Sequence, residues 1–120
     1  MNFLKQGAGA CVLFTLATIG ATASAAEVRV TCEVRPGRAK ISVDGRDLAP
    51  GRYTTVAVSG GNMATSPVEA AVGGEVEADY DSNPADIRAG AVAIPSTFIT
   101  GGTVTGKIVN ASGNTVTSDT

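Results

Sequence analysis

The residues of this chain that could perform chemistry are mainly carboxylates gathered in one stretch. Glu75, Glu77, Asp79 and Asp81 stand at alternate positions, and Asp86 follows shortly after them. Alternate residues of an extended strand share one face and lie about 7 Å apart, a spacing at which two carboxylates can act across a glycosidic bond. Aromatic residues, which line most sugar clefts, make up only 4% of the chain. A solvated strand face is therefore the favoured interpretation of this stretch.

The same region contains the only candidate metal site. Asp79, Asp81 and Asn83 offer side-chain oxygens at alternate positions, as the first half of a calcium loop does. Pro84 stands where such a loop needs glycine, and Gly90 stands where it needs a bidentate glutamate. This excludes an EF-hand and leaves a weak calcium candidate, in a chain for which we otherwise expect no cofactor.

Other catalytic chemistry has few residues available. The chain contains no histidine, which removes the commonest general base and the commonest ligand of transition metals. Two cysteines and two methionines are too few for a zinc, copper or iron–sulfur site. A serine could be activated by Lys40 or Lys107, but both lysines lie in alternating strand patterns that are typical of solvated charge. We therefore expect no enzymatic activity.

The first 26 residues predict a secretory signal peptide. Lys5 supplies a positive charge, residues 11–23 form an apolar and small-residue run, and residues 23–25 read Ala-Ser-Ala, a pattern cut by signal peptidase. The run is too short, and contains too much Gly and Thr, to span a membrane. The sequence thus predicts an exported protein, secreted or periplasmic. Its mature part is a single domain over residues 27–120.

Removal of this leader would take Cys11 with it and would leave Cys32 as a lone thiol. Such a thiol is unusual in an oxidising compartment. Three interpretations stay open: the thiol is buried and inert, it pairs between chains, or its partner cysteine lies beyond Thr120 because the sequence is C-terminally truncated. The run at residues 115–120, which reads as a strand that stops abruptly, motivates the third.

The pattern of the mature part favours strands. Apolar residues alternate with polar ones over residues 28–35 and again over 38–44, and Pro36-Gly37 separates the two runs. We expect an antiparallel hairpin with Cys32 on its inward face. A third strand is expected over residues 53–59.

Further elements follow toward the C-terminus. Gly73-Gly74 predicts a type I′ turn between strands at residues 68–72 and 75–80. Residues 83–90 predict one turn of helix, capped by Asn83. A last hairpin is expected from residues 103–109 and 115–118. Leu48 is the only leucine after the leader and the chain has no tryptophan, so the core is thin. The spacing of these elements predicts an all-β fold, an immunoglobulin-like antiparallel β-sandwich of about seven strands.

Residues 102–109 with 113–116 resemble the strand–turn–strand pattern of bacterial immunoglobulin-like and related secreted modules. The resemblance implies a sandwich fold and an exported role. The sequence has no immunoglobulin disulfide pattern, core tryptophan or tyrosine corner, so no functional residue is carried over from it.

Charge is the remaining guide to partners. The formal net charge is −2 and becomes about −3 without Lys5, which argues against nucleic-acid binding. Basic groups gather in residues 27–60 and acidic groups in residues 61–120. Self-association through oppositely charged faces is one possibility that this asymmetry suggests. The best candidate contact surface is the first hairpin, through the four residues Arg29, Arg35, Arg38 and Lys40, and the carboxylates Glu75, Glu77 and Asp79 come second.

The sequence as a whole predicts an exported, non-enzymatic β-sandwich module with a binding or structural role and an unknown protein or surface partner. An alternative is an accessory subunit of an envelope or extracellular assembly that acts through strand pairing. A weak calcium-binding module is a third interpretation.

Overall fold

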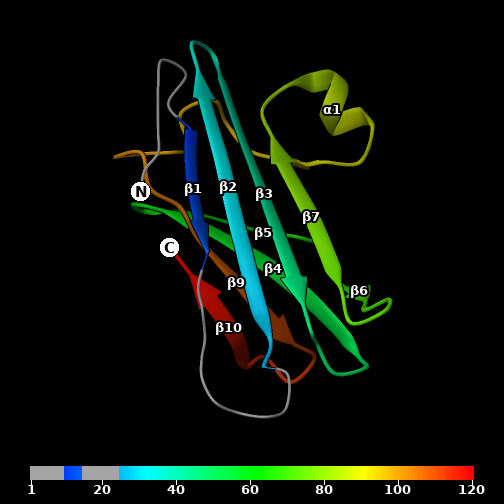
Figure 1. The fold of residues 1–120 in the computed structure, drawn as a ribbon. Coiled ribbons are helices and arrows are strands. Elements are labelled where there is room, and N and C mark those ends of the chain that lie inside the picture. Colours follow the sequence, from blue (N-terminus) through cyan, green and yellow to red (C-terminus); the bar gives the residue numbers. More distant parts are fainter. Residues whose placement is uncertain (1–9, 15–24) are drawn as a thin grey trace.

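The chain folds into two β-sheets packed face to face, as seen in Figure 1. The computed structural model describes the backbone of residues 10–14 and all of residues 25–120. Within these residues, sheet A contains, in spatial order, β1 (Ala10–Phe14), β2 (Glu27–Arg35), β3 (Arg38–Arg46), β7 (Val76–Asp81) and β8 (Val92–Ala93). Sheet B contains β10 (Thr115–Asp119), β9 (Thr105–Asn110), β4 (Arg52–Ser59) and β5 (Asn62–Thr65), and β6 (Glu69–Ala70) pairs with the other end of β4. The predicted all-β fold is confirmed.

The first hairpin forms as the alternation predicted. β2 and β3 pair in register over nine residues each, from Glu27 opposite Arg46 to Arg35 opposite Arg38. Pro36 and Gly37 form the two-residue turn, and Gly37 adopts a φ of 74°, which a residue with a side chain rarely adopts. The even-numbered residues of β2 face the other sheet, and Val28 and Val30 are almost fully buried.

The core between the sheets holds Val, Ile and Ala side chains together with Tyr80 and Phe98, and two glycines face it where the backbones come close together. Gly106 on β9 faces β2 and β3, and a Cβ atom there would overlap Val30 and lie 3.4 Å from Val43. Gly45 on β3 likewise faces Ile108 of β9 and Leu48 of the segment between β3 and β4. Two glycines facing the core therefore set the distance between the sheets.

A buried hydroxyl group network crosses this apolar core. The Tyr80 hydroxyl is hydrogen-bonded to Thr55 Oγ1, and both residues are fully buried. Ser66 Oγ accepts a hydrogen bond from the Thr55 N–H at 2.9 Å and donates one to the Pro67 carbonyl at 2.9 Å. Each buried hydroxyl thus has a partner, which avoids the cost of an unsatisfied polar group.

The turn at Gly73-Gly74 is confirmed, but the strands around it differ from the prediction. Both glycines have positive φ, and Val72 and Glu75 exchange two backbone hydrogen bonds across them. The flanking strands then separate, because β6 pairs with β4 of sheet B and β7 pairs with β3 of sheet A. The turn therefore forms a corner between the sheets instead of the tip of a hairpin. The short strand β5 was not predicted either.

The predicted helical turn is present as α1 (Pro84–Arg88). Asn83 is its N-cap and accepts a hydrogen bond from the Ala85 N–H, and Pro84 occupies the first turn. The helix carries the chain from β7 to β8, which pairs parallel to β7. The sequence predicted a purely antiparallel sandwich, so this parallel pair is a departure from the prediction. It is possible because the segment with α1 supplies the crossover connection that parallel strands need. Among the described residues, no helix is long and apolar enough to cross a membrane.

The predicted signal peptide lies mostly outside the described residues, which omit 1–9 and 15–24. Residues 10–14 are described as β1, which pairs antiparallel with β2. Cleavage of the leader stays a prediction. If it occurs, it removes the strand that covers the outer edge of β2.

The close approach at Gly106 can be tested by substitution. We expect Gly106→Ala to destabilise the fold by about 1–3 kcal/mol, because the added methyl group would overlap the stiff, buried side chain of Val30. Urea denaturation measures the change in unfolding free energy. Gly61→Ala is the matched control, since a Cβ atom there meets nothing within 4 Å. Equal stability of the two variants would contradict the proposed sheet spacing.

Candidate functional site

An ion-pair cluster centred on the buried Asp81 fastens α1 to sheet A. Arg38 donates from Nε to Asp81 Oδ1 at 3.2 Å and from Nη2 to Asp81 Oδ2 at 3.0 Å. The same Nη2 donates to Asp86 Oδ2 at 2.8 Å, which joins β3 to the helix. The Asn83 N–H donates a further hydrogen bond to Asp81 Oδ1 at 2.9 Å. The Asp81 side chain is only 1% exposed, so these bonds replace its hydration.

The electrostatics of this cluster favour the ionised pair. Burial by itself would raise the pKa of Asp81, but hydrogen bonds from Arg38 and Asn83 and the charges of Arg38 and Lys40 outweigh it and lower the pKa below its ordinary value. The pKa of Arg38 is raised, chiefly by the hydrogen bond to Asp81. The Arg38–Asp81 pair is therefore charged at neutral pH, and the cluster has a structural role because each member binds another.

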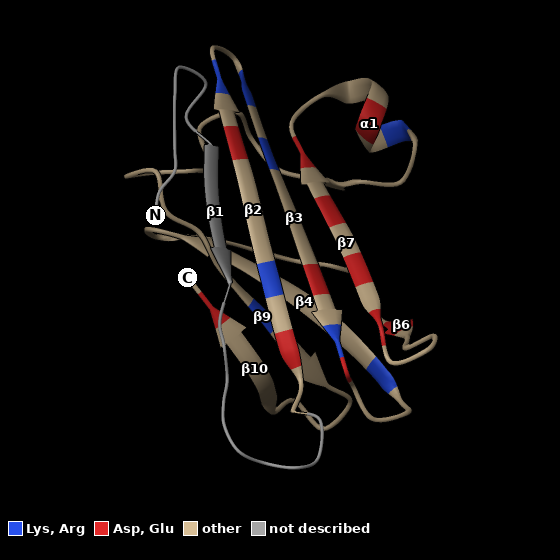
Figure 2. Cartoon of the chain, in the orientation of Figure 1, with Lys and Arg blue, Asp and Glu red and all other residues tan. Residues whose placement is uncertain are grey.

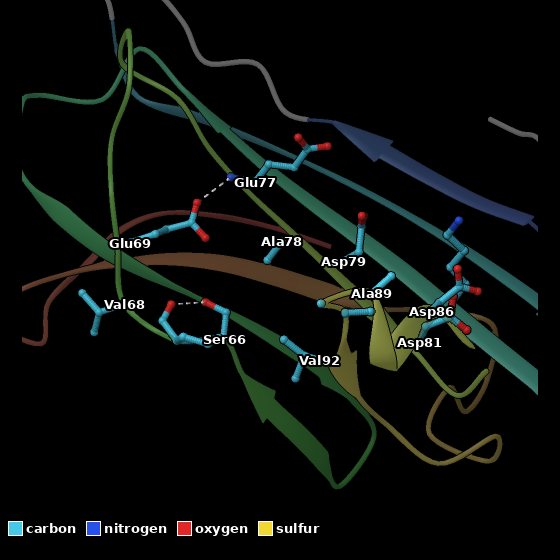
Figure 3. Close-up of a pocket in the computed structure, with 14 residues that line it drawn as sticks. Ser66, Val68, Glu69, Glu77, Ala78, Asp79, Asp81, Asp86, Ala89 and Val92 are labelled. Carbon is cyan, nitrogen blue, oxygen red and sulfur yellow. Dashed lines mark hydrogen bonds between the residues drawn. The ribbon is translucent and has the colours of Figure 1, made fainter. Parts of the chain in front are cut away.

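A pocket of about 400 Å³ lies beside this cluster, between β7, the segment that leads into β6, and the end of α1 (Figure 3). Carboxylates dominate its polar lining, and Lys40 is the basic residue among its lining groups. Glu69 reaches across to β7, where its Oε1 accepts a hydrogen bond from the Glu77 N–H at 3.2 Å. Ser66 also lines the pocket, but its hydroxyl is held by Thr55 and Pro67.

The carboxylates of this region are close enough to repel one another. The pKa of Glu77 is raised, first by the charge of Asp44, which lies opposite on β3, then by partial burial and by Asp79 and Glu69. Asp79 in turn accepts a hydrogen bond from Ser42 Oγ at 2.7 Å. These carboxylates can attract a cationic group. Three of them, Glu69, Asp79 and Asp81, already accept hydrogen bonds from other groups of the protein.

Figure 2 shows how charge is distributed over sheet A, where basic and acidic residues are interspersed along β2 and β3 and β7 carries acidic residues only. The predicted basic surface and the predicted acidic stretch thus belong to one sheet face. Of the four predicted contact residues, Arg38 binds Asp81 and Asp86, and Arg35 pairs with Glu33. The strand registers place Arg29 in the cross-strand row Arg29–Asp44–Glu77. They place Lys40 in the row Glu33–Lys40–Asp81. The row Thr31–Ser42–Asp79 lies between these two.

The calcium candidate residues lie close together in the chain, but other groups occupy their oxygens. Asp81 binds Arg38, Asn83 Oδ1 caps α1, and Asp79 binds Ser42. Over the part of the chain that the structure describes, no group of three or more histidine, cysteine or acidic side chains is arranged to hold a metal ion. A cation at this place would have to displace the Arg38 guanidinium. Calcium binding stays a prediction.

Cys32 lies on the inward face of β2 and is 5% exposed, as the alternation predicted. In this chain, which retains residues 10–14, Cys32 is disulfide-bonded. The register of β1 places Cys11 directly opposite it. The lone thiol was predicted for the processed chain and stays a prediction for that form.

The backbone of β3 shows how hydrogen bonds are shared within sheet A. The Ala39 N–H donates to Ser82 Oγ at 3.0 Å, and the Ser82 N–H donates to the Ala39 carbonyl at 3.0 Å. Both backbone groups of Ala39 therefore point toward β7. Because these groups alternate in direction along an antiparallel strand, those of Lys40 and Ser42 point toward β2.

The same alternation defines a second candidate site, the outer edge of β2. Glu33 and Thr31 lie opposite Lys40 and Ser42, so they use their backbone groups to bond β3. The intervening residues direct their N–H and C=O groups away from β3, toward β1. They are Val28, Val30, Cys32 and Val34. No side-chain motif marks this site, and only the strand pairing shows it.

In this structure β1 pairs along the outer side of β2, so the edge of β2 becomes open only if residues 10–14 are removed. β5 has four residues, and the pairing of β10 with β9 is interrupted by a register shift between Thr115 and Thr117. The edge of β7 is covered by β8, and Glu69 caps its Glu77 N–H. β2 is nine residues long and pairs with β3 without a register shift. Long, regular edges of this kind are templates for further strands.

Comparison of the chain with protein-family models, with curated proteins and with solved structures found no match. The fold and the sites described above therefore carry the functional argument.

The Arg38–Asp81 pair makes a pH-dependent contribution to stability that can be measured. We expect Asp81→Asn to lower the unfolding free energy at pH 7 by about 2 kcal/mol, because it removes the charge from a buried, hydrogen-bonded pair. Since the folded pKa of Asp81 is depressed, the wild-type advantage is present above the unfolded value near 4 and is lost as pH falls below it.

Urea titrations between pH 7 and pH 3 test this expectation, with Asp47→Asn as the control. Asp47 is exposed and has a φ of 54°, which asparagine also tolerates. A constant difference between Asp81→Asn and wild type across this pH range would show that the pair has no such role.

Repulsion at Glu77 predicts a substitution that stabilises the protein. We expect Glu77→Gln to raise the unfolding free energy at pH 7 by about 0.5 kcal/mol, because it removes a negative charge beside Asp44, Asp79 and Glu69. A raised carboxyl pKa disfavours the folded state above the unfolded pKa, so the gain should shrink as pH falls toward 4. It should also shrink in 1 M salt. Thermal unfolding provides the measurement. Glu75→Gln is the control, because Glu75 lies outside this group of carboxylates. A loss of stability in Glu77→Gln would contradict the proposed repulsion at Glu77.

Proposed function

We propose that this chain is an exported, non-enzymatic β-sandwich module, immunoglobulin-like in architecture, whose role is to bind another protein. The binding surface is the first hairpin, and within it the outer edge of β2. The proposal unites the two interpretations that the sequence favoured, a binding module that uses its basic hairpin and an accessory subunit that acts through strand pairing.

The relation between β1 and the predicted leader carries this proposal. β1 pairs with β2 from Arg29 to Glu33, and all of β1 lies within the segment predicted to be removed on export. Export would then expose the backbone groups of β2 that β1 satisfies. Unpaired N–H and C=O groups on a regular strand favour the addition of a strand from a partner, in which main-chain hydrogen bonds supply affinity.

The chemistry of the other sites supports a binding role over catalysis. The charged groups nearest the pocket bind one another, and Asp81 and Arg38 form a pair that would have to open before either could act on a substrate. The Ser66 hydroxyl is held by two backbone groups. The edge of β2, by contrast, presents a surface whose hydrogen bonds an added strand completes.

The test begins with the complete chain expressed in a bacterial host. Intact-mass measurement of the exported product should show a new N-terminus at Ala26 or Glu27. A fluorescent peptide with the sequence of residues 8–15, carrying Cys11→Ser and a lysine tail, is then titrated into the processed protein. We expect saturable binding by anisotropy, because the peptide can replace β1 at the edge of β2.

A peptide that also carries Leu13→Pro is the matched control. Leu13 lies opposite Val30, so its N–H belongs to the set that pairs with the outer edge of β2, and proline removes this donor. Equal binding of the two peptides, or no binding of either, would refute strand addition at β2. A product that retains Met1 would refute export.

A further inference from the structure

We propose that the pocket beside β7 binds an extended segment of a partner protein in which an apolar residue is flanked by lysine or arginine. The pocket lies at the edge of sheet A opposite β1, so the inference does not depend on whether residues 1–26 are removed. It goes beyond binding at the β2 edge, because it adds a second site and names the chemistry of the ligand.

The first argument is the direction of the backbone groups of β7. Both backbone groups of Ala39 on β3 point toward β7. By the alternation of an antiparallel pair, Ala78 and Tyr80 bond β3 with their own backbone groups. The N–H and C=O groups of Glu77 and Asp79 therefore point the other way, along the wall of the pocket.

The hydrogen bonding along this wall has a gap. At one end the Glu77 N–H donates to Glu69 Oε1. At the other end Val92 lies opposite Tyr80 in a parallel pair, which directs its N–H to the Asp79 C=O. Between these contacts, the Glu77 C=O and the Asp79 N–H have no hydrogen-bond partner among residues 25–120. A single extended residue of a peptide can donate to the first and accept from the second, as a residue of a parallel strand does.

The second argument is charge. At one end of the pocket, Arg38 binds two carboxylates and Lys40 lies opposite one of them. The other carboxylates of the lining, Glu69, Glu77 and Asp79, form no ion pair within residues 25–120. Their mutual repulsion contributes to the raised pKa of Glu77. A cationic side chain beside them would relieve this repulsion.

The third argument is the apolar part of the lining. Ala78 is buried and faces the interior side of sheet A, and Val68 lines the same pocket although it is 56% exposed. Val68 and Val92 lie on the side of Ala78 away from the Glu77 carboxylate (Figure 3). A peptide residue opposite Ala78 directs its side chain to this apolar side. Its two neighbours then project to the other face, beside the exposed side chains of Glu77 and Asp79.

The size of the gap limits the ligand. The pocket has a volume of about 400 Å³, at the lower end of the range of ligand sites. Glu69 closes the wall at one end and β8 closes it at the other, so only a short segment can pair with β7. We therefore expect weak binding, with a Kd on the order of 0.1–1 mM for a short peptide.

The test is an NMR titration of the complete ¹⁵N-labelled chain with the capped peptide acetyl-Gly-Lys-Val-Lys-Gly-amide. We expect saturable shifts centred on residues 77–79. The Asp79 amide proton should move downfield, because it gains a hydrogen-bond acceptor. The Glu77 amide is the internal reference and should move less, since Glu69 already holds it. No binding, or saturation without a shift at Asp79, would overturn the proposal.

Control ligands separate strand pairing from attraction of charge alone. A peptide with glutamate in place of both lysines should not bind measurably. A peptide with proline in place of valine lacks the N–H that donates to the Glu77 C=O, and its binding should be weaker by about fivefold or more. Spermidine carries positive charge but no peptide group. Equal binding of the valine and proline peptides, or an equal shift of the Asp79 amide with spermidine, would refute pairing with β7.

Substitutions in the protein test the carboxylates. Glu77→Gln and Asp79→Asn remove charge with little change of size, and each should weaken binding of the lysine peptide about threefold. Both variants should fold, because Glu77→Gln relieves repulsion and asparagine at position 79 can still accept a hydrogen bond from Ser42. Glu75→Gln and Asp47→Asn are the matched controls, since both residues are exposed and lie outside the pocket lining. Equal affinity of all four variants would contradict the proposed recognition of basic side chains.

The outcomes separate this inference from the proposed function. A chain that binds the lysine peptide at β7 but fails to bind the β1 peptide would refute strand addition at β2 alone. A chain that binds the β1 peptide but leaves the Asp79 amide unchanged with the lysine peptide would overturn the β7 site alone.

Discussion

The pairing of β2 with β3 is the constraint on which the rest of this structure depends. Its register decides which side chains face sheet B, because a slip by one residue would turn Val28 and Val30 toward solvent. It also decides which backbone groups of β2 bond β3 and which point outward. The pairing thus sets the core and also decides which backbone groups of β2 are left for β1, and the hairpin turn at Pro36-Gly37 holds it in place.

The core explains why this register has to be accurate. The interior combines aliphatic side chains with the rings of Tyr53, Tyr80 and Phe98. The sheets approach until Gly106 meets Val30 and Gly45 meets Ile108. Each small side chain contributes little, at about 25 cal/mol per Å² of buried apolar surface. Stability therefore also depends on polar contacts that bind distant parts of the chain. Arg38 with Asp81 is the clearest of these, and Thr55 with Tyr80 is another.

Local sequence signals were sufficient for elements whose partners lie nearby in the chain. Period-two alternation predicted β2, β3 and β4, and Asn83-Pro84 predicted the start of α1, because capping and turn preferences are properties of a few consecutive residues. Pairing between distant segments was not predictable in this way. Residues 68–72 and 75–80 both alternate like strands, but the choice of β4 and β3 as their partners depends on the completed sheets.

The candidate sites show the same limit. The acidic stretch was visible in the sequence, whereas the pairing of its Asp81 with Arg38, 43 residues away, was not. The edge of β2 could not be seen at all, because its functional groups are backbone N–H and C=O groups common to every residue.

The account is tested most directly by residue-resolved amide hydrogen exchange in dilute solution of the processed chain. It predicts alternation along β2, with slow exchange at Thr31 and Glu33, which bond β3, and fast exchange at Val28 and Val30, whose backbone groups point away from β3. Uniformly fast exchange along β2 would show that its pairing with β3 is wrong. Uniformly slow exchange in the dilute monomer would show that the outer edge is not open.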